Sequence, residues 1–211
     1  MKKLRVLNLY CGLGGNRKLW QNVEVTAVEY DPAIAQIYKN FFPDDKVVCV
    51  DAHQYLLDHY KEYDFIWSSP PCPTHSDIRR CGVHAGQYEA KYPDMQLYEE
   101  IILLQNFAPK DCKWVVENVK PYYTPLIPAK EIERHLFWTN FDITTIKLND
   151  KRVHNDIIGS KVVYGFDLEN YTGIDKRKCL RNMVNPDLGL HILNEALNIK
   201  DKPITEQLNL L

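Results

Sequence analysis

Short apolar runs alternate along this chain with stretches of helical character, and this alternation constrains the fold more than any other feature. The apolar runs have the length of buried strands and lie at residues 4–10, 25–29, 47–50, 63–67, 114–118 and 136–143. Helices are predicted over residues 16–21, 31–41, 52–60, 94–108 and 188–197. Strands that alternate with helices predict an α/β fold with a doubly wound, mostly parallel sheet.

The length of 211 residues fits one domain, and 45% hydrophobic with 26% charged residues is typical of a soluble globular protein. No apolar run is long enough to cross a bilayer, and the start Met1-Lys2-Lys3 leads into a strand rather than a signal peptide. The six cysteines contain no C-x-x-C pair, which disfavours zinc. We therefore expect a cytoplasmic monomer that binds neither metal nor membrane.

One part of the chain differs from the rest in charge and pattern. Residues 147–181 hold eight Lys or Arg against five Asp or Glu, a net of +3, which leaves −5 for the remainder of a chain whose total is −2. The same part is polar and shows no sustained period beyond the short run at 161–164. We divide the chain into a core of residues 1–143 and 181–200, a small irregular insert of residues 144–180, and a tail of residues 201–211.

Three motifs stand at the ends of predicted strands. The first strand runs into Tyr10-Cys11-Gly12-Leu13-Gly14-Gly15, whose glycines let the backbone approach a ligand. The fourth ends in Ser69-Pro70-Pro71-Cys72, where two prolines stop the strand and present a cysteine away from the core. The fifth carries Glu117-Asn118-Val119. Because open α/β sheets bind ligands at the carboxyl ends of their strands, these motifs predict one shared site.

Together and in this order, the three motifs resemble those of the C5-cytosine DNA methyltransferases, in a short bacterial or phage form. The resemblance runs from Leu7 to Pro186. It implies a Rossmann-like methyltransferase fold, S-adenosylmethionine as methyl donor and double-stranded DNA as substrate. The insert stands where the family often has a sizeable target-recognition domain, so we expect a short recognition sequence or the help of a protein partner.

The resemblance also implies a donor site along the ends of the first three strands. Glu29 is expected to accept both ribose hydroxyls, Tyr30 to lie on the adenine face, and Asp51 to accept the adenine amino group. A motif at residues 181–186 is similar to the one with which the family closes the pocket, although it departs from the usual Gly-Asn-Ala-Val-Pro. The expected donor-binding residues are Tyr10, Gly12, Gly14, Gly15, Glu29, Tyr30, Asp51, Ala52, Pro70, Asn182 and Val184.

The chemistry that the resemblance implies needs a covalent nucleophile, because carbon 5 of cytosine is a poor nucleophile by itself. A thiolate that adds to carbon 6 turns the ring into an enamine, and Cys72 is expected to have this role. Glu117 is expected to donate to N3 as a carboxylic acid with a pKa raised by partial burial. Arg134 is the arginine found where the family carries Gln-x-Arg-x-Arg, and we expect it to bind the cytosine O2 and lower the pKa of the thiol. Asn118 is expected to orient the neighbouring turn.

Two segments are expected to contact DNA. Residues 73–92 are polar and irregular, and we interpret them as a mobile loop that closes over the site, with Arg79, Arg80 and His84 near phosphates. Chemistry at carbons 5 and 6 needs the base flipped out of the duplex. Sequence choice is expected in the insert, whose basic residues include Lys151, Arg152, Lys161, Lys176, Arg177 and Lys178.

Three other functions share parts of this pattern. An amino-methyltransferase also uses a Ser-Pro-Pro turn, but it needs an aromatic residue where Cys72 stands. An RNA methyltransferase of the same family, active on cytosine C5 of tRNA, stays open. A non-catalytic nucleic-acid binder is disfavoured by the intact Cys72, Glu117 and glycine turn.

Overall fold

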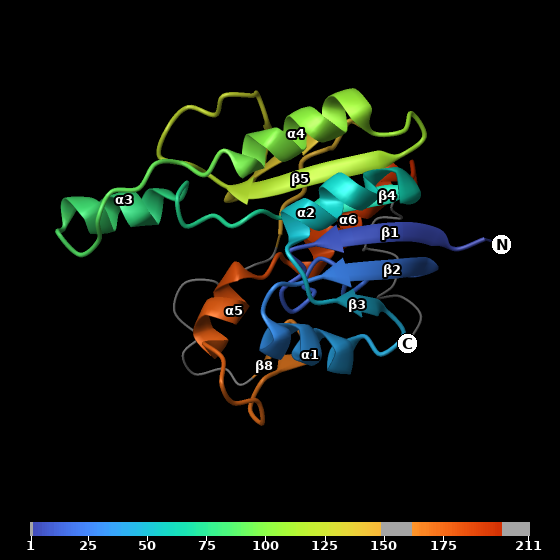
Figure 1. The fold of residues 1–211 in the computed structure, drawn as a ribbon, viewed down its shortest axis with the longest axis horizontal. Coiled ribbons are helices and arrows are strands. Elements are labelled where there is room, and N and C mark those ends of the chain that lie inside the picture. Colours follow the sequence, from blue (N-terminus) through green and yellow to red (C-terminus); the bar gives the residue numbers. More distant parts are fainter. Residues whose placement is uncertain (1, 149–161, 200–211) are drawn as a thin grey trace.

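Residues 2–148 and 162–199 are described by the structure, a computed structural model. They form one large sheet with helices on both faces and a separate two-stranded hairpin (Figure 1). In chain order the elements are β1 (Leu4–Leu9), β2 (Val23–Val28), α1 (Pro32–Phe41), β3 (Lys46–Val48), α2 (Ala52–His59), a short 3-10 helix η1 (Tyr60–Glu62), β4 (Phe65–Ser68), α3 (Asp77–His84), α4 (Gln96–Phe107), β5 (Lys113–Val119), β6 (Lys130–Ile132), β7 (His135–Thr139), β8 (Val162–Val163), β9 (Phe166–Asp167), α5 (Lys176–Asn182) and α6 (Pro186–Ala196).

The main sheet has the strand order β3-β2-β1-β4-β5-β7-β6. Strands β1 to β5 pair in parallel, and β7 and β6 run antiparallel to their neighbours. From β1 the chain first builds the sheet towards β3 and then returns to add β4 and β5 on the other side. The strand order therefore reverses between β1 and β4, which is where open α/β sheets bind their ligands. The predicted doubly wound, mostly parallel α/β fold is confirmed.

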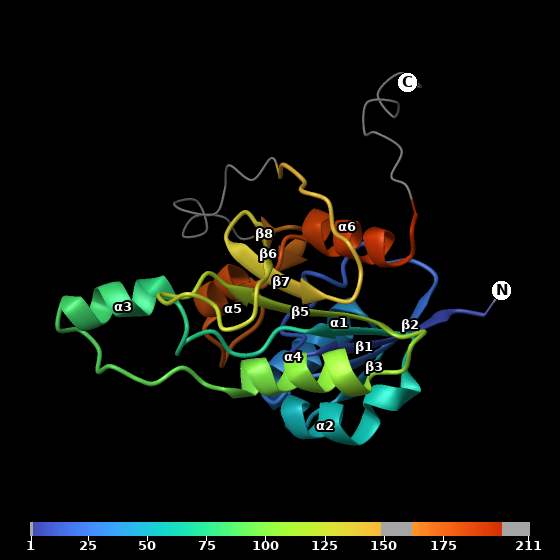
Figure 2. The ribbon, with the colours of Figure 1, turned by 90° about the horizontal axis from the view of Figure 1, so that it is seen from above.

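Both faces of the sheet are buried, which explains why its strands read as continuous apolar runs. On one face Val6, Phe65 and Trp67 pack with residues of α1 and α6. On the other, Leu7 and Ile66 pack with residues of α2 and α4. Figure 2 shows α2 and α4 on one side of the sheet and α6 on the other.

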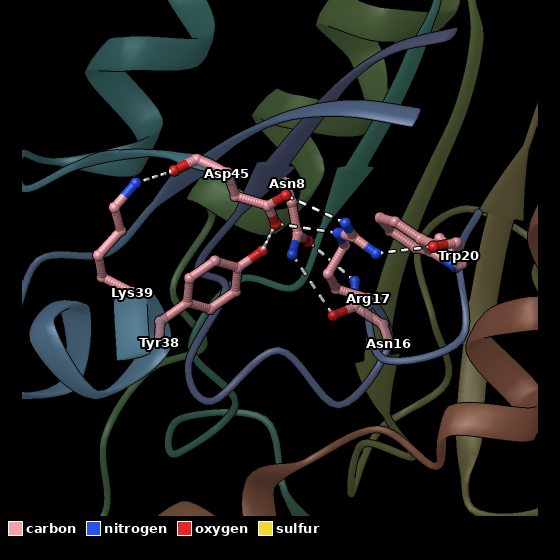
Figure 3. A network of polar contacts seen from close by, with 7 residues as sticks. All are labelled: Asn8, Asn16, Arg17, Trp20, Tyr38, Lys39 and Asp45. Carbon is pink, nitrogen blue, oxygen red and sulfur yellow. Dashed lines mark hydrogen bonds and ion pairs between the residues drawn. The ribbon is translucent and has the colours of Figure 1, made fainter. Parts of the chain in front are cut away.

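Residues 16–21 form turns instead of the predicted short helix, so that prediction is wrong. Their backbone makes i to i−3 bonds, from Lys18 N to Gly15 O and from Trp20 N to Arg17 O. Side chains hold the segment in place, as Figure 3 shows: Asn16 Nδ2 donates to Asn8 Oδ1 at 2.8 Å, and Arg17 Nη1 donates to Trp20 O at 2.8 Å. These contacts fix the segment without a continuous helical ladder.

Asp45 is the centre of the network in Figure 3 and is only 3% exposed. Its carboxylate accepts from Arg17 Nε at 2.9 Å and Nη2 at 3.0 Å, and from Tyr38 Oη at 2.8 Å. Lys39 Nζ donates to the Asp45 backbone carbonyl at 2.6 Å. A buried charge must be paired and hydrogen-bonded, and this one satisfies both needs while it ties the turn after β1 to the connection between α1 and β3.

The segment 73–92 contains helix α3, so the prediction of an irregular loop is wrong for residues 77–84. Both views show α3 projecting away from the sheet, beyond the carboxyl ends of the strands (Figures 1 and 2). The ring of Tyr88 lies against Gly82, where an added Cβ would come within 2.3 Å of Tyr88 Cδ2, and the Arg79 guanidinium lies 5.5 Å from the centre of that ring. Arg80 of the same helix donates to Tyr122 O at 3.1 Å, so the helix is held by contacts within its own segment and with the segment after β5.

The remaining differences concern the edge of the sheet and the insert. The strand expected over 136–143 is β7, which ends at Thr139, and its partner β6 was not predicted. In the insert, β8 and β9 form a hairpin, and Phe166 packs in a cluster with Leu13 of the glycine turn. Lys151, Arg152, Lys161 and the tail 201–211 lie outside the described residues. The role of the insert in target recognition stays a prediction.

Among the described helices, none combines the length and apolar character that crossing a membrane requires.

The pair Arg17–Asp45 should contribute strongly to stability, since removing one partner leaves a buried charge. We expect Arg17→Ala to lower the free energy of unfolding by about 3–5 kcal/mol in urea denaturation. Arg5→Ala is the matched control, because Arg5 pairs with Asp64 at 2.7 Å in a partly exposed setting and its loss should cost clearly less. Equal losses in the two variants would contradict this assignment.

Candidate active site

The turn that carries Cys72 leaves β4 and is closed by its own backbone. The Cys72 carbonyl accepts from the N–H groups of His75 and Ser76, both at 3.0 Å. Asn118 Nδ2 donates to Pro70 O at 2.9 Å from the neighbouring strand, and Asn118 Oδ1 accepts from Val119 N. Asn118 therefore holds the turn, as its position in the sequence predicts.

The Cys72 side chain is partly buried, and its surroundings favour the neutral thiol. Burial raises the pKa of Cys72, and the negative charge of Glu117 raises it further. Arg134 and Lys178 act in the opposite direction but are outweighed. Arg134 thus has the predicted sign of effect on the thiol, while the pKa as a whole stays above its usual value.

Glu117 lies near the end of β5, is 5% exposed and accepts hydrogen bonds on both carboxylate oxygens. Ser69 Oγ donates to Oε2 at 2.8 Å and itself accepts from Trp67 Nε1 at 2.8 Å. His135 Nδ1 donates to Oε1. Donors to the charged form of a carboxyl group favour that form.

The predicted rise in the pKa of Glu117 is wrong in direction. Burial does push this pKa upward, but the imidazole of His135, the hydroxyl of Ser69 and the guanidinium of Arg134 together outweigh it. The pKa of Glu117 therefore lies below its usual value. The free protein holds a carboxylate, not a carboxylic acid, near its thiol.

Arg134 and His135 form a chain of hydrogen bonds that ends on Glu117. Arg134 Nε donates to His135 Nε2 at 3.1 Å, which assigns the imidazole proton to Nδ1, the atom that faces Glu117. Arg134 Nη2 donates to the Arg181 carbonyl at 3.0 Å and so ties the site to α5. Sequence reasoning missed His135: it lies diagonal to Glu117 only because β7 pairs antiparallel with β5, with Glu117 opposite Phe137.

The glycine turn has one open position and two packed ones. A Cβ at Gly14 would come within 2.5 Å of Phe42 Cε2, and one at Gly15 within 2.3 Å of the Val184 carbonyl oxygen. Gly12 has a φ of +53° and nothing within 4 Å of an added Cβ. Gly14 and Gly15 therefore serve the packing of the protein, whereas Gly12 leaves space for a ligand to approach the backbone.

Two carboxylates stand beside this turn. Glu29 accepts from Gly12 N at 3.0 Å and from Asp31 N at 3.1 Å, one bond on each oxygen, and each oxygen keeps a second lone pair. Asp51 caps α2 by accepting from Gln54 N at 2.8 Å and is exposed. The open Gly12 and these acceptors fit a ligand that carries hydroxyl and amino donors, as S-adenosylmethionine does.

Of the other predicted donor residues, some are buried, some are exposed, and Tyr10 is partly buried. Ala52 and Pro70 are buried, and Val184 brings the last motif against the glycine turn. Tyr30 is 76% exposed, and Asn182 is exposed at the end of α5. Tyr10 follows β1 directly with a φ of +53°, an unusual value for a non-glycine residue.

Replacing Ser69 should test how Glu117 is held. The interactions that depress its pKa stabilise the fold above the unfolded pKa, and this contribution is lost as the pH falls through the folded pKa. We expect Ser69→Ala to lower the free energy of unfolding by about 1.5–3 kcal/mol at pH 7, and by less in acid.

Urea denaturation at several pH values measures this effect, with Ser76→Ala as the control. Ser76 caps α3 without a side-chain hydrogen bond, so its loss should be small and independent of pH. A loss in Ser69→Ala that does not shrink in acid would contradict the role given to Ser69.

A family model described as C-5 cytosine-specific DNA methylase matches residues 4–124 of the chain. No curated protein matches the sequence of this chain. Solved structures with a similar fold include a SAM-dependent methyltransferase from Agrobacterium tumefaciens, with 15% identity, a TM-score of 0.40, and coverage of 57% of this chain and 40% of that one. A putative methyltransferase from Escherichia coli has 18% identity, a TM-score of 0.44, and coverage of 64% and 74% respectively. The chain thus spans less than half the length of the Agrobacterium protein.

Since the family model covers more than half of the sequence, the chain belongs to the C-5 cytosine-specific DNA methylases.

Proposed function

We propose that this protein transfers a methyl group from S-adenosylmethionine to carbon 5 of cytosine in DNA, through a bond between Cys72 and carbon 6 of a flipped-out base. The observation that carries the proposal is the position of the cysteine turn beside a buried carboxylate, Glu117, on the adjacent strand. A thiol and a carboxylate at neighbouring strand ends suit nucleophilic addition with proton transfer. Membership of the family supports the same reaction.

S-adenosylmethionine, when bound, would supply a methyl group activated by a positively charged sulfur. The chain would hold it along the ends of β1 to β3, with its amino-acid end near Gly12 and its ribose hydroxyls donating to Glu29. Asp51 would accept from the adenine amino group. The open space at Gly12 and the lone pairs that remain on Glu29 support this arrangement.

The first chemical step depends on the protonation states of Cys72 and Glu117. In the free protein the sulfur carries a proton and the carboxylate does not, because the pKa of Cys72 is raised and that of Glu117 is lowered. We propose that the thiol proton passes to Glu117 and from there to N3 of cytosine as the bond between sulfur and carbon 6 forms. Carbon 5 would then take the methyl group, and loss of the carbon-5 proton to water would break the bond between sulfur and carbon 6. The proton held at N3 would return through Glu117 to the departing thiolate. The carboxylate then acts first as a base and next as an acid.

The surroundings of the strand ends support a nucleic-acid substrate. Helices α3 and α5 come from distant parts of the chain, and both lie beyond the carboxyl ends of the strands (Figures 1 and 2). Each carries basic residues, and Lys178 of α5 lies near enough to Cys72 to influence its pKa. Phosphate contacts from such residues would give affinity without sequence choice.

Covalent trapping tests the proposed reaction directly. A base can remove a proton from carbon 5 but cannot remove fluorine, so with 5-fluorocytosine the adduct between enzyme and base persists. We expect the protein, with S-adenosylmethionine and duplex DNA that contains 5-fluorocytosine in varied contexts, to form a complex that survives denaturing electrophoresis. Cys72→Ser should form none.

Transfer RNA that contains 5-fluorocytosine provides the second arm of this experiment. A complex with RNA alone would overturn the DNA substrate but keep the reaction. Absence of a complex with either nucleic acid would overturn the proposed function.

Donor binding should survive the loss of the nucleophile, because the two sites use different strand ends. In calorimetry, Cys72→Ser should bind S-adenosylmethionine with nearly the wild-type affinity, and Asp51→Ala should lose about 1–3 kcal/mol. Asp31→Ala is the matched control, since Asp31 also caps a helix, α1, and has no expected contact with the donor. Equal damage from Cys72→Ser and Asp51→Ala would show that the sites are wrongly placed.

A further inference from the structure

Glu100 is a fully buried carboxylate that the proposed mechanism does not use. It lies on α4 and has 0% exposure. Tyr10 Oη donates to its Oε1 at 2.6 Å, and Ser68 Oγ donates to its Oε2 at 2.5 Å. His53 Nδ1 lies 3.1 Å from Oε1. A buried carboxylate without such partners would be strongly destabilising, so each of these groups is held firmly to Glu100.

The three partners belong to three different elements around the proposed site. Tyr10 directly follows β1 and begins the glycine turn. Ser68 is the last residue of β4 and precedes the turn that carries Cys72. His53 lies in the first turn of α2, two positions after Asp51. One carboxylate therefore contacts the elements that lead to the donor and the element that leads to the nucleophile.

The position of Glu100 relative to the sheet explains why these contacts matter. Strands β1 and β4 are neighbours, with Leu9 opposite Ser68, and the strand order reverses between them. The carboxylate of Glu100 thus lies across the switch point of the sheet, where the two turns diverge. The left-handed backbone of Tyr10, at φ +53°, is a conformation that persists only where the surroundings enforce it.

We propose that Glu100 is a positioning residue that couples the donor turn after β1 to the nucleophile turn after β4. This inference rests on the proposed function and identifies a residue that contacts neither donor nor base. A residue that served the donor alone would change only donor affinity, and one that served the nucleophile alone would change only the rate. Glu100 should change both.

His53 provides a spectroscopic signature of this arrangement. Its pKa is raised, first by the hydrogen bond to Glu100 and also by the charges of Glu100, Glu99 and Asp51, while burial acts in the opposite direction. The stabilising contact is therefore complete below the unfolded pKa of histidine and is lost as the pH rises through the folded pKa. Loss of the Glu100 charge should lower the pKa of His53.

The test compares Glu100→Gln and Glu100→Ala with Glu99→Ala. Glu99 is the matched control: it is the next carboxylate on the same helix, its side chain is 62% exposed, and it lies 3.5 Å from His53 Nε2. Donor affinity is measured by calorimetry, and the rate of methyl transfer by single turnover at saturating donor. We expect Glu100→Ala to weaken donor binding and to slow the single turnover, each by about tenfold or more, on the scale of hydrogen bonds to a charged group.

Glu100→Gln keeps the shape and one acceptor, so it should show smaller losses in both quantities, and its His53 should titrate at lower pH by NMR. Glu99→Ala should stay within about twofold of the wild type in both, on the scale of an exposed ion pair. If Glu100→Ala does not fold, the comparison of Glu100→Gln with Glu99→Ala still tests the inference.

Each outcome decides the inference. If the Glu100 variants lose donor affinity but keep the single-turnover rate, or the reverse, Glu100 serves one turn and the coupling is wrong. If Glu100→Gln matches Glu99→Ala in affinity, rate and His53 titration, the inference fails while the proposed function stands. If the wild type and Glu99→Ala neither bind the donor nor transfer a methyl group, the proposed function fails and the inference fails with it.

Discussion

The pairing of β1 with β4 in the middle of the sheet is the constraint on which the rest of the structure depends. Because these strands are parallel, with Leu9 opposite Ser68, their carboxyl ends reach the same edge together. The glycine turn and the cysteine turn then leave the sheet side by side. Burial on both faces makes this pairing strong, and it fixes the register of two motifs that lie far apart in the sequence.

The two proposed catalytic groups illustrate a competition between burial and hydrogen bonding. Burial alone would make both Cys72 and Glu117 neutral, and for Cys72 it prevails. For Glu117, donors from β4 and β7 reverse the outcome. The two groups therefore differ in charge although both are buried or partly buried, and moving the thiol proton to the carboxylate is uphill in the free protein, because the pKa of the donor is raised and that of the acceptor is lowered. For Glu117, the positions of Ser69 and His135 matter more than how deeply the carboxylate is buried.

Much of the fold and part of the site could be predicted from the sequence, and the failures have physical causes. Parallel strands buried on both faces leave continuous apolar runs, so β1 to β5 were found near their observed bounds. Helix α3 is short and mostly polar, so it lacks the apolar residues by which a buried helix is recognised. His135 and Glu100 act through contacts of long range: one depends on the antiparallel return of β7 and the other on the packing of α4 over the switch point. Neither contact leaves a local pattern.

The buried pair Arg17–Asp45 also has a consequence for how this sequence can change over generations. Replacing both residues together with apolar ones of similar volume can be nearly neutral in a protein interior, whereas replacing either alone leaves a charge stranded. The two positions are 28 apart in the chain, yet we expect them to change together or not at all. A homologous sequence that has lost this pair must have passed through a poorly folding single variant or acquired both substitutions at once. Tyr38 donates to the same carboxylate, so loss of Asp45 also leaves the Tyr38 hydroxyl without its acceptor.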